Sequence, residues 1–330
     1  MTDEDIFQMK IDGGAFSAAL SPAFQRDRTC FASGASGLFR SQDTGSTWQL
    51  AVEAKEPDER LSVLALSLSP DYENDGTLFA GMQGGVLRSW DGGGSWAATV
   101  FPPPMPTVSA LAISPVFPKD SILFVGTSED GVFRTSDRGL TFTSWNFGLL
   151  DLRIYGLLVS PAFEVDETVF AATESGIFKS KNGGRSWREV DFPASAAPVL
   201  SLAISPNFAD DGMLYGGTES SGLFKSLDGG RTWMSIGDER LSGSINVITV
   251  SPQFLNESYL FVATTQHIFF SKDKGVEWQE WAQVPGVMAL SAPQGVEGET
   301  GVLVGTATGG VGWAMHKSAD LRSNITSIAT

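Results

Sequence analysis

Cysteine and histidine are scarce in this 330-residue chain. The single cysteine, Cys30, excludes an internal disulfide, and we interpret it as a small buried hydrophobic residue rather than a reactive thiol. The two histidines, His267 and His316, are too few for a multi-histidine metal site and suggest no Ser-His-Asp arrangement. No phosphate-binding loop is evident. The sequence therefore predicts neither a cofactor nor a bound metal.

Positive charge and long apolar runs are also lacking. The 22 basic residues are outnumbered by 38 acidic ones, so the net charge is −16. This charge disfavours nucleic acid and anionic membrane surfaces as partners and fits a cationic partner or simple solubility. No apolar stretch approaches the roughly 18 residues of a membrane helix, and the first residues show no signal-peptide pattern. We expect no membrane insertion and a cytoplasmic location, unless a leader was removed.

What the chain has in abundance is a repeated turn, in which a hydroxyl residue, an acidic or amide residue and a glycine precede an aromatic residue. Its six copies are centred on Asp43, Asp91, Asp137, Asn182, Asp228 and Asp273, at steps of 48, 46, 45, 46 and 45 residues. The aromatic residues that follow are Trp48, Trp96, Phe142, Trp187, Trp233 and Trp278. A second marker, Ser-Pro followed two residues later by an aromatic residue, recurs six times in phase. This period is typical of a four-stranded propeller blade.

The pattern Ser-x-Asp-x-Gly-x-Thr-Trp resembles the Asp-box, or BNR repeat, and the chain resembles BNR-repeat β-propellers over nearly its whole length. That family includes sialidases, xyloglucan-hydrolysing propellers, the luminal domain of sortilin and a photosystem II assembly factor. Because it spans hydrolases, receptors and assembly factors, the resemblance implies the fold and leaves the function open.

Within each box we expect a structural role for the acidic residue. Its carboxylate is placed to accept backbone N–H bonds of the turn, and the glycine two residues later tolerates a positive φ. Ligand binding is the alternative, but one carboxylate per box is fewer than a calcium loop requires.

We predict an all-β fold, a seven-bladed β-propeller of four-stranded antiparallel blades, as a single domain over residues 1–330. The expected blades span approximately 15–60, 61–106, 107–152, 153–197, 198–243, 244–285 and 286–330. The seventh repeat has no box, so one chain end must supply its outer strand. We favour residues 4–10 over the tail at 324–329, because a terminal strand there leaves no unpaired edge. Six blades with an added hairpin is the alternative.

With the four expected strands of a blade called A to D in chain order, the repeated turns join C to D. We expect function on the opposite face, which is formed by the B–C connections and by the D–A connections between blades. Arg60, Arg153 and Arg240 each precede an A strand and could converge to bind a carboxylate or phosphate. The alternative is that each arginine pairs with a neighbouring acid. Three aromatic residues are expected near the same rim: Trp145, Tyr155 and Trp281. They could stack on a bound sugar or peptide, or they could simply pack against the protein.

Paired carboxylates for glycoside hydrolysis could come from the B–C loops, which carry Glu129, Asp130, Glu174 and Glu219. A sialidase is disfavoured, because no Arg-Ile-Pro motif occurs and Tyr155 is the one plausible nucleophile. Xyloglucan enzymes resemble two propellers facing across a cleft, whereas this chain has one. We therefore predict a non-enzymatic propeller that recognises a protein or peptide partner at its channel mouth. A carbohydrate-binding or glycoside-hydrolysing propeller is the alternative.

Overall fold

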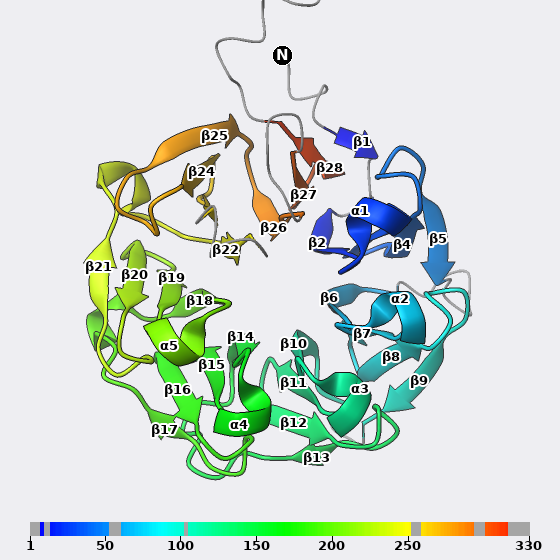
Figure 1. Ribbon diagram of the computed structural model, residues 1–330, viewed down its shortest axis with the longest axis horizontal. Coiled ribbons are helices and arrows are strands. Elements are labelled where there is room, and N and C mark those ends of the chain that lie inside the picture. Colours follow the sequence, from blue (N-terminus) through cyan, green and yellow to red (C-terminus); the bar gives the residue numbers. More distant parts are fainter. Residues whose placement is uncertain are drawn as a thin grey trace, which may run out of the picture.

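The computed structural model describes residues 7–9, 14–52, 61–101, 105–251, 259–293 and 301–315. Seven four-stranded antiparallel sheets stand around a central axis and close into a ring, a β-propeller (Figure 1). The predicted fold class and the number of blades are therefore confirmed. No helix among these residues is long and apolar enough to cross a membrane.

Blades one to six each use four consecutive strands, which we call A to D from the axis outward. Blade one contains β2 (Ala15–Leu20), β3 (Cys30–Gly34), β4 (Gly37–Ser41) and β5 (Gln49–Val52). Blade two contains β6 (Val63–Leu68), β7 (Leu78–Met82), β8 (Gly85–Ser89) and β9 (Ala97–Val100). Blade three contains β10 (Val108–Ile113), β11 (Leu123–Thr127), β12 (Val132–Thr135) and β13 (Thr143–Ser144).

The second half of the ring follows the same order. Blade four contains β14 (Ile154–Val159), β15 (Val169–Thr173), β16 (Ile177–Ser180) and β17 (Arg188–Glu189). Blade five contains β18 (Val199–Ile204), β19 (Leu214–Thr218), β20 (Leu223–Ser226) and β21 (Met234–Ile236). Blade six contains β22 (Val247–Val250), β23 (Leu260–Ala263), β24 (His267–Ser271) and β25 (Gln279–Gln283). Two 3₁₀ turns, η2 (Ala194–Ala196) and η3 (Glu239–Leu241), lie in D–A connections.

Blade seven joins the two ends of the described chain. It contains β26 (Val287–Ser291), β27 (Val302–Thr306) and β28 (Gly310–Ala314), and its outermost strand is β1 (Phe7–Met9). Phe7 lies opposite Gly312, and Met9 lies opposite Val311, in an antiparallel pair (Figure 1). The N-terminal segment thus closes the ring, as expected, and pairs an edge that would otherwise be open. The alternative segment, 324–329, lies outside the described residues.

The A–B connections of blades one to five, which carry the Ser-Pro marker, form one-turn helices. They are α1 (Phe24–Asp27), α2 (Tyr72–Asp75), α3 (Phe117–Asp120), α4 (Phe163–Asp166) and α5 (Phe208–Asp211). In the second blade, the Ser69 hydroxyl donates to Asp75 Oδ2 at 2.7 Å, and Asp75 Oδ1 accepts from Thr77 N at 2.8 Å. The other four connections repeat this pairing of the serine with an aspartate six residues later. That aspartate is visible in the sequence but was missed.

In all six C–D turns the central side-chain oxygen accepts from the hydroxyl two residues earlier and from the backbone N–H four residues later, and the second turn also has a bond from the later hydroxyl. Asp91 Oδ1 accepts from the Ser89 hydroxyl and from Ser95 N, both at 2.8 Å, and Oδ2 accepts from the Ser95 hydroxyl at 2.6 Å. The two residues after the acidic position both have positive φ, 73° at Gly92 and 91° at Gly93. The first of these two residues is not glycine in three turns, at Thr44, Arg138 and Lys274.

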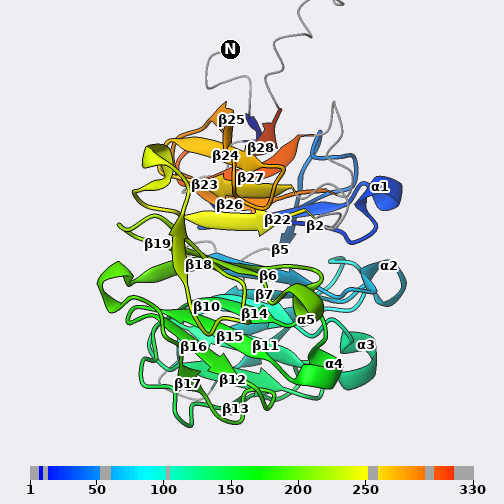
Figure 2. The same ribbon diagram turned by 60° about the vertical axis from the view of Figure 1, so that its left-hand side comes forward.

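The C–D turns and the A–B helices lie on one face of the ring, which we call the turn face. Gly92 N of the second turn donates to Gly76 O, the residue after α2, at 2.9 Å, and four other blades have the equivalent bond. Figure 2 shows all five helices on one side of the molecule. The D–A and B–C connections form the opposite face, which we call the loop face.

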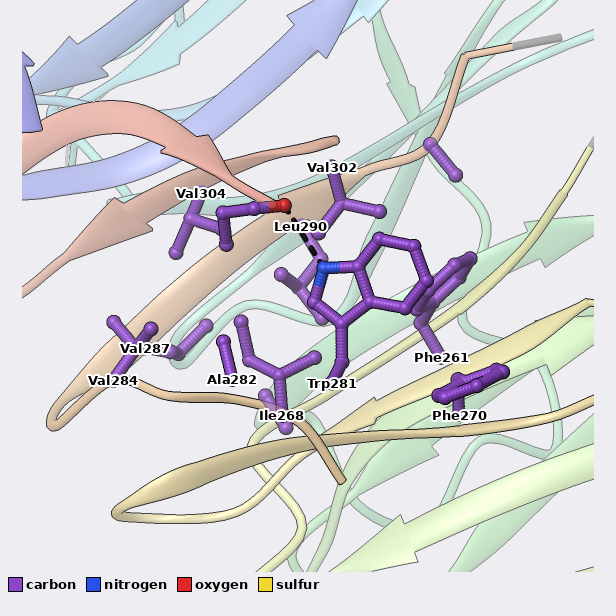
Figure 3. Close-up of a cluster of buried hydrophobic side chains, with 13 residues drawn as sticks. Phe261, Ile268, Phe270, Trp281, Ala282, Val284, Val287, Leu290, Val302 and Val304 are labelled. Atoms are coloured by element: carbon purple, nitrogen blue, oxygen red, sulfur yellow. Dashed lines mark hydrogen bonds between the residues drawn. The ribbon is translucent and has the colours of Figure 1, made fainter. Parts of the chain in front are cut away.

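Hydrophobic side chains pack between neighbouring sheets, and one cluster shows that packing, the second of the two expectations for Trp281, is correct. Trp281, expected at the rim, is on β25 and is only 4% exposed. Its indole Nε1 donates to Ala314 O of blade seven at 2.8 Å, and its ring meets Phe261 and Phe270 edge-on (Figure 3). The side chain of Trp281 points from strand D into the hydrophobic core, where it joins blades six and seven. It is therefore not available to a ligand.

Cationic side chains on three C strands tie each blade to the next. Arg88 Nη1 donates to Gly139 O at 2.6 Å, Lys179 Nζ to Gly229 O at 2.5 Å and Lys225 Nζ to Lys274 O at 2.8 Å. Each acceptor belongs to the C–D turn of the following blade. These residues therefore satisfy turn carbonyls, a role that the sequence analysis did not assign.

Candidate binding site on the loop face

The candidate site is an open pocket of about 940 Å³ between blades three and four. Its walls are the B–C loops of both blades and the D–A connection between them. The lining residues are Glu129, Leu150, Asp151, Leu152, Arg153, Glu174, Ser175, Phe178 and Glu189. Three of them, Glu129, Arg153 and Glu174, were candidates from the sequence.

Asp151, which the sequence analysis passed over, holds two walls of this pocket together. Its carboxylate accepts from Ser175 N at 2.7 Å, across the pocket, and from Arg153 N at 3.0 Å. Burial acts to raise the pKa of Asp151, but the backbone N–H groups of Arg153 and Ser175 and nearby hydroxyls hold it below its ordinary value. The residue is therefore an anion that positions the D–A connection. Asp often accepts the backbone N–H of the residue two positions later and so forms a local turn. The Asp151-Leu152-Arg153 segment could have been predicted to do so from the sequence.

The two arginines of the predicted cluster that the structure describes, Arg153 and Arg240, have separate partners. Arg153 forms an ion pair with Glu174 at the pocket wall. Arg240 binds Asp238 through Nε at 2.9 Å and through Nη2, which also donates to Trp278 O of blade six at 2.9 Å. Arg240 is absent from the pocket lining. Arg60 lies outside the described residues. Pairing with a neighbouring acid, the alternative expectation, accounts for both described arginines.

The two remaining rim aromatics occupy different places. Trp145 lies beside the fourth C–D turn: its ring centroid is 5.8 Å from the guanidinium of Arg185 in that turn and 4.3 Å from that of Arg134. Tyr155, on β14, is 41% exposed. Burial and then the charge of Glu174 raise the pKa of Tyr155, which opposes formation of a phenolate nucleophile.

The carboxylates proposed for hydrolysis are only partly brought together. Glu129 and Glu174 line the pocket, whereas Asp130 and Glu219 do not. Because Glu174 is paired with Arg153, it is held by a cation. The pocket adds Asp151 and Glu189, so its lining has four carboxylates and one guanidinium.

Exposed apolar side chains adjoin these acids. Leu150 and Leu152 both line the pocket and are 81% and 38% exposed. The segment that carries them is well anchored, since Leu149 is buried and Asn146 Oδ1 accepts from Val132 N at 2.7 Å. A fixed loop thus presents leucine side chains to solvent at an acidic pocket.

Metal and thiol chemistry find little support among the described residues. No group of three or more His, Cys, Asp or Glu side chains there could hold a metal ion. Cys30 is fully buried, and burial raises the pKa of its thiol to about 12.

Comparison with known proteins places the fold but no family. No family model matches the chain, and no curated protein matches it. Similar solved structures include a GH74 enzyme from Niastella koreensis, with a TM-score of 0.73 and 18% identity over 91% of this chain and 52% of that one. The GH74 xyloglucanase from Xanthomonas campestris gives 0.71 and 17%, over 91% and 51%. The extracellular domain of BT4673 from B. thetaiotaomicron gives 0.69 and 15%, over 95% and 40%.

The chain spans about half or less of the length of these structures. At these identities the similarity establishes the propeller fold alone.

Proposed function

We propose that this propeller binds a protein or peptide partner on its loop face, at the pocket between blades three and four. The partner would present a basic side chain beside an apolar one. The observation that carries this proposal is the pocket lining, in which four carboxylates and a single guanidinium surround the exposed Leu150.

Charge and apolar area both favour such a partner. The one cation of the lining, Arg153, already pairs with Glu174, and Glu129 has no ion pair among the described residues. An incoming Lys or Arg would pair with Glu129, and the net charge of −16 would speed its approach. Covering Leu150 would contribute roughly 1.5–3 kcal/mol, the usual value for burying such a side chain.

The same lining argues against hydrolysis as the main activity. A glycosidase needs a protonated general acid and a separate base or nucleophile. Here Asp151 is kept ionised by backbone N–H groups, and Glu174 is neutralised by Arg153. Both are better placed to shape the pocket than to exchange protons.

Binding can be tested with arrayed peptides that place Lys or Arg next to Leu or Phe, followed by titration of the best binder. We expect Leu150→Ser and Glu129→Gln each to raise the dissociation constant at least fivefold, which corresponds to a loss of about 1 kcal/mol of binding free energy. Val165→Ser is the matched control, since Val165 is 88% exposed on α4 of the turn face. If no basic-apolar peptide is preferred over its acidic counterpart, or if all three variants bind equally, the proposal is wrong.

A carbohydrate-active propeller is the second candidate. It is supported by the GH74 neighbours and by the two carboxylates, Glu129 and Glu174, that line one pocket. Incubation with xyloglucan and measurement of new reducing ends would test it. Turnover by the wild-type protein that disappears in Glu129→Gln and in Glu174→Gln would replace the binding proposal with this one.

A further inference from the structure

A second crevice, of about 510 Å³, lies on the turn face between the C–D turns of blades four and five. It shares Glu189 with the loop-face pocket, and its other lining residues are different. Blade four contributes Lys179, Lys181, Asn182, Ser186, Arg188, Glu189, Val190 and Asp191, and blade five contributes Asp228, Gly229, Gly230 and Arg231.

Four cationic side chains gather at this crevice, in a chain that has only 22 lysines and arginines. Lys181, Arg188 and Arg231 are exposed, and none of them takes part in an ion pair among the described residues. Three such cations around one cavity therefore leave a local excess of unpaired positive charge.

Lys179 forms the half-buried part of the cluster. Its ammonium donates to Gly229 O and lies 5.1 Å from the centroid of the Phe170 ring. Burial, and next the charge of Lys181, lower the pKa of Lys179. The two lysines are thus close enough to repel each other, and an anion between the turns would relieve that repulsion.

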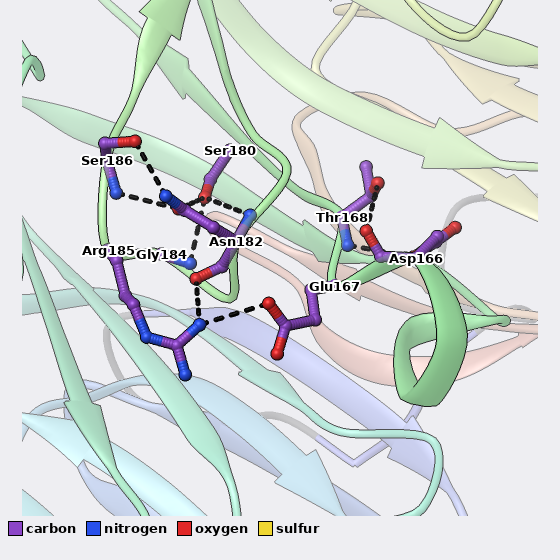
Figure 4. Close-up of polar contacts among 8 residues, drawn as sticks. All are labelled: Asp166, Glu167, Thr168, Ser180, Asn182, Gly184, Arg185 and Ser186. Carbon is purple, nitrogen blue, oxygen red and sulfur yellow. Dashed lines mark hydrogen bonds and ion pairs between the residues drawn. The ribbon is translucent and has the colours of Figure 1, made fainter.

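The fourth turn lacks the carboxylate that the other five turns have, because Asn182 stands at the acidic position. Figure 4 shows that the amide makes the same turn: Oδ1 accepts from the Ser180 hydroxyl and from Ser186 N, both at 2.9 Å. Nδ2 donates to the Ser186 hydroxyl at 2.9 Å, where an aspartate would accept. The substitution therefore preserves the turn and removes one negative charge from the crevice.

The carboxylates that remain do not cancel the cations. Asp228 accepts hydrogen bonds from Ser226, Arg231 N and Thr232 within its own turn and remains a negative charge at the crevice. With Glu189 and Asp191, the lining has three carboxylates against four cations. An aspartate at position 182 would make the two numbers equal.

We propose that the crevice between the fourth and fifth C–D turns binds a tetrahedral oxyanion, a phosphate or sulfate group. Lys181, Arg188 and Arg231 are its charged ligands, and Asn182 is the residue that makes the site net positive. Guanidinium and ammonium groups are the usual protein ligands for such anions. This site does not depend on the proposed partner binding at the loop face.

The test is a titration of the whole chain with inorganic phosphate, monitored through the backbone amide NMR signals of the two turns. A titration with sodium chloride at matched ionic strength is the control. Saturable shifts confined to residues 181–186 and 228–232 are expected with phosphate and not with chloride. Sulfate and phenyl phosphate form two further arms, which distinguish a site for the free anion from a site for a phosphate ester. Shifts that are equally large with chloride, or that do not saturate, would overturn the proposal.

Three variants make the test specific. Asn182→Asp should weaken phosphate binding about fivefold, the effect of one unit charge near 4 Å in a water-like dielectric. The double variant Arg188→Gln with Arg231→Gln should abolish saturation. Lys272→Gln is the matched control, because Lys272 precedes Asp273 as Lys181 precedes Asn182. Unchanged affinity in Asn182→Asp, in a variant whose turn signals remain intact, would exclude the assigned role of Asn182.

Discussion

Replacement of Trp281 provides a strong test of how the ring is held together at its closing blade. The indole belongs to blade six, and its Nε1 donates to Ala314 O of blade seven at 2.8 Å. Its ring meets Phe261 and Phe270 edge-on, at centroid separations of 5.1 and 5.2 Å. At 4% exposure, nearly all of this surface is lost from water.

The expected cost follows from these contacts. Truncation of a buried tryptophan or phenylalanine to alanine usually destabilises by about 3–5 kcal/mol, and here it also leaves Ala314 O without its partner. We expect Trp281→Ala to lower the free energy of unfolding by about 4–5 kcal/mol. Trp281→Phe keeps most of the apolar volume and loses the N–H donor, so a loss of about 1–2 kcal/mol is expected.

Urea unfolding followed by far-UV circular dichroism would measure both losses. Trp90→Ala is the control, since Trp90 is 41% exposed and its removal should cost far less. A loss below about 1 kcal/mol in Trp281→Ala would refute this account. So would a variant of undiminished stability that fails to bind a loop-face ligand, because Trp281 would then be a rim residue after all.

Three further predictions concern acid stability, thiol reactivity and close packing between blades. Hydrogen bonds from the hydroxyl and N–H of Ser95 lower the pKa of Asp91 from 3.8 to about 2. The unfolded chain therefore binds more protons between these values, and stability should fall as the pH decreases from about 4 to 2; Asp91→Asn, which mimics the fourth turn, should show a smaller fall in melting temperature. Cys30 should not react with a thiol reagent at pH 8 until the protein is unfolded, and then one equivalent should react; rapid labelling of the native protein would contradict its burial. Gly126→Ala should destabilise by about 1–3 kcal/mol in thermal unfolding, because the new Cβ would lie 2.5 Å from Ile154 Cγ2 of the next blade, while Gly243→Ala, with nothing within 4 Å, should be nearly neutral.

The repeated turns explain why the fold could be predicted at all. Each turn is a local structure, in which an acidic or amide residue bonds residues within four positions of itself. Asn182 satisfies the same turn as Asp91, so the pattern tolerates that change. Because one blade cannot bury both faces of its sheet, six such patterns at a nearly regular spacing of 45–48 residues indicate blades that pack against one another.

Contacts between blades were much harder to predict. Trp281 and Trp145 looked alike in the sequence, each an aromatic residue near the end of a repeat. The structure buries Trp281 against blade seven and places Trp145 beneath Arg134 and Arg185. Both outcomes depend on the neighbouring blade, whose position relative to each aromatic residue has no signature in the local sequence.

The amino-acid sequence by itself determined the blade count, the turn chemistry and the charge of the protein, because these depend on residues close together in the chain or on composition. Only the tertiary structure decided which candidates share a site. Glu129, Asp151 and Glu174 meet because two B–C loops and one D–A connection end at the same point of the ring. Arg240 is excluded because Asp238 and Trp278 O hold it elsewhere. The physical reason is that the site is built from loops of two adjacent blades. Its net charge depends on which loops the packing of those blades brings together.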